Sequence, residues 1–369
     1  MPAPPTVRLF LCGDVMLGRG VDQLFARSCR PRIYESMMKS AIGYIELAER
    51  VSGPIPRPVE PAYPWGDALE LLDALRPDAR IINLETALTV SEAAAPKGIN
   101  YRAHPSNVAV LGAAAVDCCS LANNHVLDWG EAGLLETLAT LERAGIATTG
   151  AGADLLSARA PARLELPGGG AILVFGLCLG DSGVPGSWAG GPHRAGVHFL
   201  AELSDATVDE LAAAVAAVKR PGDLAIASIH WGGNWGYAIP PEHRRFAHAL
   251  IDRAGVDLVH GHSSHHPKAI ELHNERAIFY GCGDFLNDYE GIGGYEQFRP
   301  TLALMYVPTL ERSSGRLLAL ELRALRIRKL RLEHAPASDR ADLAATLDRE
   351  CARFGRRIVE REDGALVLR

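Results

Sequence analysis

The chain has 369 residues, of which 48% are apolar and 22% are charged, so it can bury a large core and is neither a disordered tail nor a fibre. The 38 Lys and Arg against 44 Asp and Glu give a formal net charge of −6 at pH 7, which argues against nucleic acid or an anionic membrane as the main partner. The N-terminal stretch has no basic region of the signal-peptide type, and its apolar run Leu9–Cys12 is far shorter than the roughly 20 residues of a membrane span. We therefore expect an unprocessed, soluble protein of the cytoplasm without a membrane span.

Short β-rich apolar runs alternate with helix-length segments, which is the pattern of a layered α/β protein. Strands are expected at Thr6–Cys12, Ala79–Asn83, Val116–Leu121, Ala171–Leu177, Asp223–Ile229, Val256–Val259 and Arg276–Tyr280. Helices are expected at Ile33–Arg50, Trp65–Leu75, Gly130–Ala144, Ser204–Val218 and Pro241–Ala254. The proline-rich segment Val51–Pro64 and the glycine-rich segment Gly180–Gly196 are expected to be long loops.

The pattern of apolar and polar residues changes from about Thr309 onward. Apolar and polar residues alternate over Leu317–His334, which is typical of a β-strand. Ala335–Phe354 has a helical pattern, and a short strand is expected at the end of the chain. We expect a first domain over residues 1–308, which includes the proline-rich insertion at 51–64, and a C-terminal α/β extension over residues 309–369 that packs on it.

The cysteines indicate reduced core thiols rather than a disulfide framework or a zinc ribbon. They are odd in number, form no CxxC pair and lie mostly in apolar runs. The seven are Cys12, Cys29, Cys118, Cys119, Cys178, Cys282 and Cys351.

Polar residues that can bind a metal follow one apolar strand after another. They are Asp14, Glu85, the triplet Asn123 to His125, His230, the segment His260 to His266, and Asp284. Because ligands of open α/β sheets bind at the carboxyl ends of the strands, six segments would deliver these side chains to one rim. Eight of the 13 histidines fall within residues 230–273, and imidazole with carboxylate and amide ligands suits Mn²⁺, Fe or Zn²⁺ rather than Ca²⁺ or Mg²⁺.

A set of motifs carries a family resemblance. GDVMLGR (13–19), NLET (83–86), LANNHVLDWG (121–130), HWG (230–232), a GHxxH segment (261–265) and YGCGDF (280–285) occur in this order. The set resembles the CapA-like family, which is named for poly-γ-glutamate capsule biosynthesis and whose fold is similar to that of calcineurin-like metallophosphoesterases. The resemblance implies a four-layer α-β-β-α sandwich with one or two divalent metal ions, Mn, Fe or Zn, at the strand ends.

The resemblance also implies roles for individual residues. Asp14 matches the aspartate ligand that follows the first strand, and Glu85 stands where a bridging carboxylate is expected. Asn124 matches the amide ligand. His125 matches the histidine that donates a proton to the departing group.

For the remaining ligands, the resemblance implies that His230 and His262 bind one metal and that His265 binds the other. The phosphoesterase pattern Asp-x-His would place a histidine at position 16, where this chain has Met16, a poor ligand for a hard cation. One of the two metal positions therefore loses a ligand.

Two assignments stay open at this level. The phosphoesterase spacing GHxH is stretched to GHSSHH, so His260 and His266 compete with His265 for the second metal. A ligating or catalytic imidazole is usually oriented by a hydrogen-bonded partner, and either Asp128 or Glu131 can orient the predicted proton donor.

The leading hypothesis is a metal-dependent hydrolase of a phosphoester or a related anionic substrate. A metal lowers the pKa of bound water from about 16 toward about 7 and so supplies hydroxide near neutral pH. His125 would act as the general acid. Arg19 is the candidate for holding an anionic group of the substrate, with Trp231 and His266 as further substrate contacts.

Two alternatives use the same residues. In a metal-dependent epimerase, similar to lasso-peptide epimerases, paired bases such as Asp14 and one of His125, His265 or His266 would exchange the Cα proton of a peptide. In the other, the chain is a noncatalytic partner in the assembly of poly-γ-glutamate. In each case we expect a small-molecule or peptide partner with an anionic group.

Overall fold

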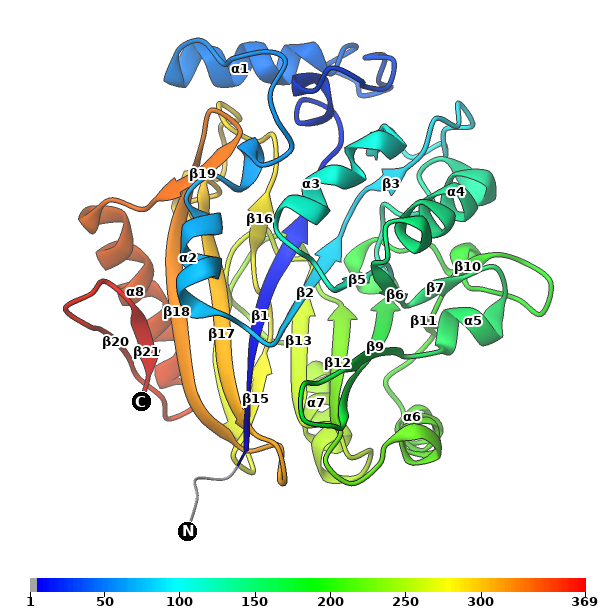
Figure 1. Cartoon of the computed structure of the whole chain (residues 1–369), viewed down its shortest axis with the longest axis vertical. Helices are drawn as coiled ribbons and strands as arrows, with labels where there is room; N and C mark the ends of the chain where they lie inside the picture. Colours follow the sequence, from blue (N-terminus) through cyan, green and yellow to red (C-terminus); the bar gives the residue numbers. More distant parts are fainter. Residues whose placement is uncertain (1–4) are drawn as a thin grey trace.

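Two large mixed β-sheets with flanking helices make up the computed structural model, which describes residues 5–369 (Figure 1). The first sheet has the order β20 (Ile358–Glu360), β21 (Leu366–Leu368), β18 (Leu317–Arg328), β17 (Leu302–Glu311), β1 (Thr6–Val15), β2 (Ala79–Leu84), β5 (Cys118–Ser120) and β6 (Ala147–Thr149). Beside this path, β16 (Asp284–Leu286) pairs with β1, and β19 (Arg331–His334) pairs with β18.

The second sheet has the order β11 (Phe199–Leu200), β9 (Ala171–Leu179), β12 (Leu224–His230), β13 (Leu258–His262), β15 (Arg276–Phe279) and β14 (Ile270–His273), with β8 (Ala162–Glu165) beside β9. Two small sheets pair β3 (Ala87–Leu88) with β4 (Arg102–Ala103) and β7 (Ala151–Gly152) with β10 (Gly196–Val197).

The two faces of β1 show how the layers are built. Successive side chains of a strand point to opposite faces. Leu9 and Leu11 belong to a core cluster that also contains buried residues of β9, β12 and β17, so this cluster joins the two sheets. Phe10 and Cys12 belong to a cluster with α2 (Ala68–Leu75) and α4 (Gly130–Arg143). The first sheet is therefore covered by helices on one face and by the second sheet on the other.

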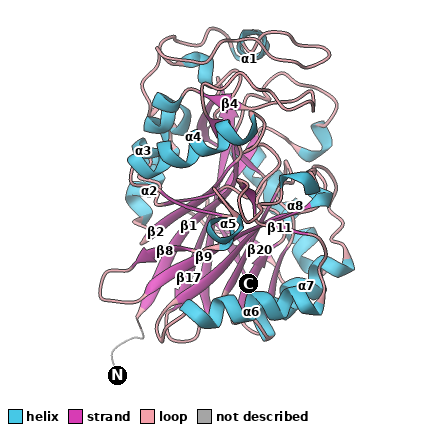
Figure 2. Cartoon of the chain, turned by 90° about the vertical axis from the view of Figure 1, so that its right-hand side faces the viewer, coloured by secondary structure: helices cyan, strands magenta, loops and turns pink. Residues whose placement is uncertain are grey.

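Helices cover the second sheet in the same way. Its other face packs against α6 (Asp205–Val218) and α7 (Pro241–Asp252). Figure 2 shows the strands between α2 to α4 on one side and α6 and α7 on the other. The remaining helices are α1 (Ile42–Ser52), α3 (Ala109–Ala113), α5 (Leu155–Arg159) and α8 (Ala337–Ala352).

Parallel strands bring many carboxyl ends to one edge. β1, β2, β5 and β6 run parallel to one another, as do β9, β12, β13 and β15. The arrowheads of β1, β2, β12 and β13 point to the same end of the molecule, which α1 covers (Figure 1). The register places Asp14 beside both Asn83 and Asp284, and His230 beside His262.

The strands predicted from the apolar runs are confirmed, with ends that differ by a few residues, and so are the helices predicted after residue 64. The helix predicted at Ile33–Arg50 is wrong in its first part, because α1 begins at Ile42. The segment before it folds back, and the Ile33 N–H donates to the Lys39 carbonyl at 3.2 Å. This turn carries Glu35 to the guanidinium of Arg19, at 2.9 Å, which a continuous helix would not provide.

The C-terminal part adds strands to the first sheet. Leu317–His334, which looks like one strand in the sequence, is the hairpin of β18 and β19, with Lys329 and Leu330 at positive φ in its turn. The boundary at residue 308 stays a prediction, and β17 runs across it from Leu302 to Glu311 between β1 and β18.

Two further expectations concern the whole chain. All seven cysteines are buried and none is in a disulfide. Within residues 5–369, no helix combines the length and the apolar character that crossing a bilayer requires. The expectation of an N-terminus without a signal peptide falls partly on residues 1–4, which lie outside the described residues.

Candidate metal centre

The predicted ligands gather at the strand ends that α1 covers. They are Asp14 near the end of β1, Glu85 after β2, Asn124 after β5, His230 and His262 as the last residues of β12 and β13, and His265 after β13. Both large sheets therefore contribute residues to this cluster.

Gly13 lets β1 and β16 approach each other at this edge. A Cβ atom on Gly13 would lie 1.8 Å from the carbonyl oxygen of Gly283, so no side chain fits there. The Asp14 N–H donates to the same carbonyl at 3.0 Å, and Asp14 lies in register with Asp284. The glycine before Asp14 is therefore a packing requirement that brings two carboxyl groups together.

Two groups of buried side chains have the spacing of a metal site. One consists of Asp14, His230 and His262, and the other of Asp14, His265 and Asp284. Within each group, one ligand atom from every residue lies within 4.8 Å of the others. Asp14 belongs to both groups, so a carboxylate of β1 connects the two positions, whereas the resemblance assigned the bridging role to Glu85.

Several atoms of the predicted ligands have no hydrogen-bond partner. Buried polar groups are normally hydrogen-bonded, so each exception indicates strain or an absent ligand. Among residues 5–369, four of the ten buried side-chain atoms without such a partner belong to the predicted ligands: Asp14 Oδ2, Glu85 Oε2, Asn124 Oδ1 and His230 Nε2. All four atoms carry lone pairs that can bind a cation, so this donor set fits a divalent metal.

The acidic residues of the cluster destabilise one another. Burial and the nearby Asp284 carboxylate raise the pKa of Asp14 to about 7. Burial and the Asp14 carboxylate raise the pKa of Glu85 well above its ordinary value. A proton between two carboxyl groups or a bound cation would relieve this repulsion. The unpartnered amide and imidazole atoms nearby favour the cation, because a proton on a carboxyl group leaves them unsatisfied.

The other oxygen of Asp14 is held in place by a chain of amides. Asn83 donates from Nδ2 to Asp14 Oδ1 at 2.8 Å, and Asn123 donates from Nδ2 to Asn83 Oδ1 at 3.0 Å. The Ser263 N–H approaches Asp14 Oδ1 at 3.4 Å from the stretched GHSSHH segment, where Ser263 takes a φ of 99°. The carboxyl group therefore has one fixed edge and presents the other to the cluster.

Three histidines of the two central strands have different surroundings. Burial lowers the pKa of His230 and of His262, which keeps both imidazoles neutral, the form that binds metals. Their Nδ1 atoms lie 2.9 Å apart. His260, by contrast, has both nitrogens in hydrogen bonds: Nε2 donates to the Cys12 carbonyl at 2.7 Å, and Nδ1 accepts from the Ser228 hydroxyl at 3.2 Å. His260 is therefore a satisfied core residue.

His265 pairs with an acidic residue. Its Nδ1 lies 2.8 Å from Asp284 Oδ1, and Asn287 donates to the second oxygen of Asp284 at 2.9 Å. Burial alone would lower the pKa of His265, but the Asp284 and Asp14 carboxylates outweigh burial and raise it. Asn234 contacts the other ring nitrogen at 3.0 Å.

His125 is oriented by Asp128 rather than by Glu131. Its Nδ1 lies 2.5 Å from Asp128 Oδ2, and its Nε2 lies 3.7 Å from Glu85 Oε1. Lys97 holds the other oxygen of Asp128 at 2.8 Å. Burial lowers the pKa of His125 to about 4, although Asp128 opposes this shift. The imidazole thus presents Nε2 to the acidic cluster from a fixed position.

Arg19 lies near the cluster within a buried ion-pair network. Its Nε donates to Asp288 at 3.1 Å and its Nη1 donates to Glu35 at 2.9 Å, while Nη2 also bonds to Asp288. The guanidinium carbon lies 3.8 Å from the centre of the Tyr44 ring. Both partners are carboxylates, so the positive charge of Arg19 is already compensated.

The other predicted substrate contacts lie deeper in the protein. Trp231 is 1% exposed, stacks on His243 and donates from its indole N–H to the Tyr280 carbonyl at 3.0 Å. His266 is 1% exposed and accepts from the Gly236 N–H at 3.0 Å. Neither residue lines the cavity described next.

A cavity of about 280 Å³ opens beside the cluster and is called the aromatic cavity below. Its lining consists of Arg19, Glu35, Tyr44, Ile99, Tyr101, Asn234, Trp235, His265, Tyr289, Ile292, Tyr295 and Pro300. His265 therefore belongs both to the candidate metal centre and to the wall of this cavity. Met16 is buried behind that wall, where its sulfur accepts a hydrogen bond from the Tyr289 hydroxyl at 3.4 Å.

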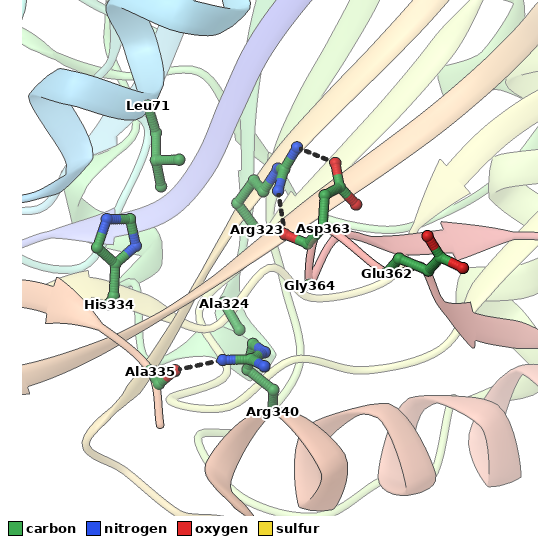
Figure 3. A pocket seen from close by; sticks show the side chains of 9 residues that line it. All are labelled: Leu71, Arg323, Ala324, His334, Ala335, Arg340, Glu362, Asp363 and Gly364. Atoms are coloured by element: carbon green, nitrogen blue, oxygen red, sulfur yellow. Dashed lines mark hydrogen bonds and ion pairs between the residues drawn. The ribbon is translucent and has the colours of Figure 1, made fainter. Parts of the chain in front are cut away.

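A larger cavity of about 370 Å³, called the C-terminal cavity below, lies between β18, β19 and α8. Figure 3 shows Arg323 directed at Asp363 and Arg340 bonded to the Ala335 carbonyl. None of its lining residues belongs to either candidate metal group.

Sequence reasoning missed several residues of the centre. The strand-end pattern includes Asp284, in the motif YGCGDF, but no ligand role was predicted for it, and none was predicted for Asn83 in the motif NLET. Lys97 and Asn234 lie in loops and carry no comparable signal, because only the folded chain brings them to His125 and His265.

Comparison with known proteins gives a consistent result. The family model for the bacterial capsule synthesis protein PGA_cap matches residues 8–289. A "Probable polyglutamine synthesis accessory protein" of Mycobacterium tuberculosis (strain ATCC 25618 / H37Rv) is 48% identical over 367 residues, which cover 99% of this chain and 96% of the relative. The "Capsule biosynthesis protein CapA" of Bacillus anthracis is 24% identical over 278 residues, 75% of this chain and 59% of the relative. The "PGA biosynthesis protein CapA" of Bacillus subtilis (strain 168) is 26% identical over 219 residues, 58% of this chain and 52% of the relative.

Proposed function

The chain belongs to the PGA_cap family of bacterial capsule synthesis proteins, and from this premise we propose that it is a metal-dependent enzyme that hydrolyses a phosphoester or a related anionic substrate. One observation carries the proposal. Buried lone-pair atoms of Asp14, Glu85, Asn124 and His230 have no hydrogen-bond partner at the strand ends. One or two cations would satisfy them.

The donor set of carboxylate, amide and imidazole suits Mn²⁺, Fe or Zn²⁺. Such an ion, when bound, polarises a phosphoryl oxygen and lowers the pKa of coordinated water. Asp14, His230 and His262 would hold one ion, and Asp14, His265 and Asp284 the other. The unpartnered oxygens of Glu85 and Asn124 are the further ligands proposed for these ions. Met16 offers only a thioether, which its contact with Tyr289 turns toward the aromatic wall.

The same proposal includes the fold of the metallophosphoesterase type. The order of helices, sheet, sheet and helices supports it, together with a candidate metal centre at the strand ends. Asp14 as the shared carboxylate and Met16 in place of a histidine are the departures from the phosphoesterase pattern.

His125 is the proposed general acid. Asp128 fixes the ring through Nδ1, which leaves Nε2 as the atom that can give a proton to a departing oxygen. Lys97 keeps Asp128 in position and partly offsets its charge. An anionic substrate beside the ring would raise the pKa of His125 from its low value and so favour the protonated donor.

Arg19 stays the proposed contact for an anionic group of the substrate. A guanidinium has five N–H donors, and three hydrogen bonds to Asp288 and Glu35 use three of them. The remaining donors can bond to a substrate oxygen. These two donors would orient the substrate oxygen. The positive charge of Arg19 is already balanced by Asp288 and Glu35.

An accessory role in polymer synthesis is the second candidate, and the names of the relatives favour it. In that role, the centre would bind a carboxylate of the polymer without turnover. A metal-dependent epimerase remains a third use of the same cluster, in which His265 or His125 would exchange a Cα proton.

Metal content and turnover test the proposal together. Full-length protein that is stripped with a chelator and dialysed against Mn²⁺, Zn²⁺ or Fe²⁺ should bind one or two equivalents and release phosphate from an aryl phosphate. His230→Ala should lose both properties. His248→Ala is the matched control and should lose neither, because His248 lies on α7 and pairs with Glu271 away from the centre.

The outcomes separate the three candidates. Deuterium at Cα of a peptide in D₂O, without phosphate release, would support the epimerase. Metal binding with neither reaction would support the accessory role. A protein that binds no metal would contradict all three metal-based functions.

A further inference from the structure

The aromatic cavity has the composition of a ligand site with little free charge. Five of its lining residues are aromatic: Tyr44, Tyr101, Trp235, Tyr289 and Tyr295. Ligand pockets are typically apolar and aromatic, with a few polar groups that fix orientation. Here His265 and Asn234 supply polar groups on the side of the candidate metal centre.

Exposed apolar side chains gather at the rim of this cavity. Ile99 is 46% exposed, Tyr295 is 41% exposed and Ile292 is 37% exposed, and all three line the cavity. They come from two segments far apart in the sequence. An apolar rim assembled in this way indicates a surface that a ligand covers, because exposed apolar groups on soluble proteins tend to mark binding sites when they cluster.

Stacked rings form one flat wall. The Trp235 ring lies 4.1 Å from the Tyr295 ring at an interplanar angle of 7°. Phe298 and His266 pack around Trp235, with ring centroids at 5.3 Å and 6.2 Å. These contacts hold the Trp235 ring in place, so Trp235 and Tyr295 present a fixed apolar surface to the cavity.

The charge balance excludes a polyanion from the cavity. Arg19 is the single Lys or Arg among its lining residues, and Asp288 and Glu35 both pair with it. One positive and two negative charges leave an excess of negative charge at this wall. The proposed metal ions and the two remaining donors of Arg19 serve one anionic group, and away from them a chain that carries a carboxylate on every repeat would meet repulsion at this wall.

We infer that the aromatic cavity takes an uncharged, ring-sized apolar group of the substrate, linked to the single anionic group that the metal centre holds. This inference rests on the proposed function, since the metal centre supplies the anchor for the anion. It identifies the substrate class as a small ester with one ring-bearing group. A poly-γ-glutamate chain does not fit this description.

Binding of non-hydrolysable phosphonates tests the inference. Calorimetric titration of the metal-loaded full chain should show phenylphosphonate binding roughly tenfold or more tightly than methylphosphonate, because the ring removes additional apolar surface from water. A γ-linked glutamate tetramer should bind more weakly than phenylphosphonate. Trp235→Ala and Tyr295→Ala should bring the ratio of the two phosphonates close to one and leave methylphosphonate binding unchanged.

Tyr34→Ala is the matched control, because Tyr34 is 38% exposed and does not line the cavity. It should keep the preference for phenylphosphonate. Equal affinities of the two phosphonates in the wild type, or tighter binding of the tetramer, would overturn the inference and leave the metal centre intact. If neither phosphonate bound to metal-loaded protein, the proposed function would fail first.

Discussion

The strand-end cluster and the C-terminal cavity both contain carboxylates, but their polar groups are satisfied differently. At the C-terminal cavity, Arg323 is bonded to Asp363 (Figure 3). Arg323 also bonds to Glu321, and Arg340 bonds to Glu360. These groups are partly exposed and have partners. At the strand ends, buried carboxylate, amide and imidazole atoms of Asp14, Glu85, Asn124 and His230 have no hydrogen-bond partner.

This difference shows which polar cluster is built for a ligand. Partly exposed ion pairs contribute little stability, and because each charged group already has a partner in the protein, no ligand is required. Buried acceptors that face one another cost free energy until something positive joins them. The larger cavity is therefore not the better candidate site. Consistent with this, the family model covers the strand-end cluster and stops before β17.

Asp14→Asn should have the largest effect, because Asp14 belongs to both candidate metal groups. We expect more than about a 100-fold loss of metal affinity, since even indirect partners of ligands affect affinity by about 10- to 100-fold. Asp363→Asn at the C-terminal cavity should leave metal affinity unchanged. Equilibrium dialysis with elemental analysis measures both, and equal losses in the two variants would break the contrast between the regions.

His125→Ala should reduce turnover by about 10²- to 10⁴-fold, the usual contribution of a general acid. Metal content should stay at the wild-type level, because His125 lies outside both metal groups. Steady-state kinetics on an aryl phosphate, with metal content measured on the same sample, gives the answer. Loss of metal in this variant would make His125 a ligand instead.

Asp128→Asn should have a smaller effect, about 10- to 100-fold on turnover, because the amide no longer holds the His125 ring in one tautomer. Asp128 is a positioning residue, so the pH profile of turnover should shift as well as its height. Glu131→Gln is the matched control and should change neither. A lower rate with an unshifted profile would indicate a structural role for Asp128 alone.

Replacing a carboxylate should change the stability of the metal-free protein in opposite directions in the two regions. With the pKa of Asp14 raised from 3.8 to about 7, the folded protein loses stability progressively as the pH rises between these two values, so Asp14→Asn should stabilise metal-free protein by at least about 1 kcal/mol near pH 8. The gain should be clearly smaller near pH 5 and should vanish below about pH 4, where Asp14 is protonated in both the folded and the unfolded state.

Asp363→Asn provides the other arm of this test. Asp363 bonds to Arg323 and Arg361, which lower its pKa, so its loss should destabilise the protein by about 0.5 kcal/mol at both pH values. Urea unfolding of chelated protein at the two pH values measures all four differences. Destabilisation by Asp14→Asn near pH 8 would show that the cluster is satisfied without a metal.

The sequence predicted the strands and the strand-end residues because both follow from local patterns. Apolar runs predict buried parallel strands, and their carboxyl ends must share an edge. It assigned His262 to one metal but left His260 and His266 in competition with His265 for the other. That choice depends on distant partners, such as the Cys12 carbonyl that satisfies His260 and the Gly236 N–H that bonds to His266.

Aromatic residues and loops were predicted less well for the same reason. Trp231 and Trp235 lie four positions apart, yet one is in the core under α7 and the other lines the aromatic cavity. The turn before α1 depends on the buried pair of Glu35 with Arg19, a contact that no local pattern contains. The strand-end pattern included Asp284, but no ligand role was predicted for it.

Anomalous diffraction from crystals of the full chain grown with Mn²⁺ tests the central claim most directly. We expect an anomalous peak within about 2.5 Å of the Asp14 carboxylate and of an imidazole of His230 or His262. Crystals in which no metal lies at the strand ends, while ordered waters or a shared proton satisfy Asp14 and Glu85, would contradict it.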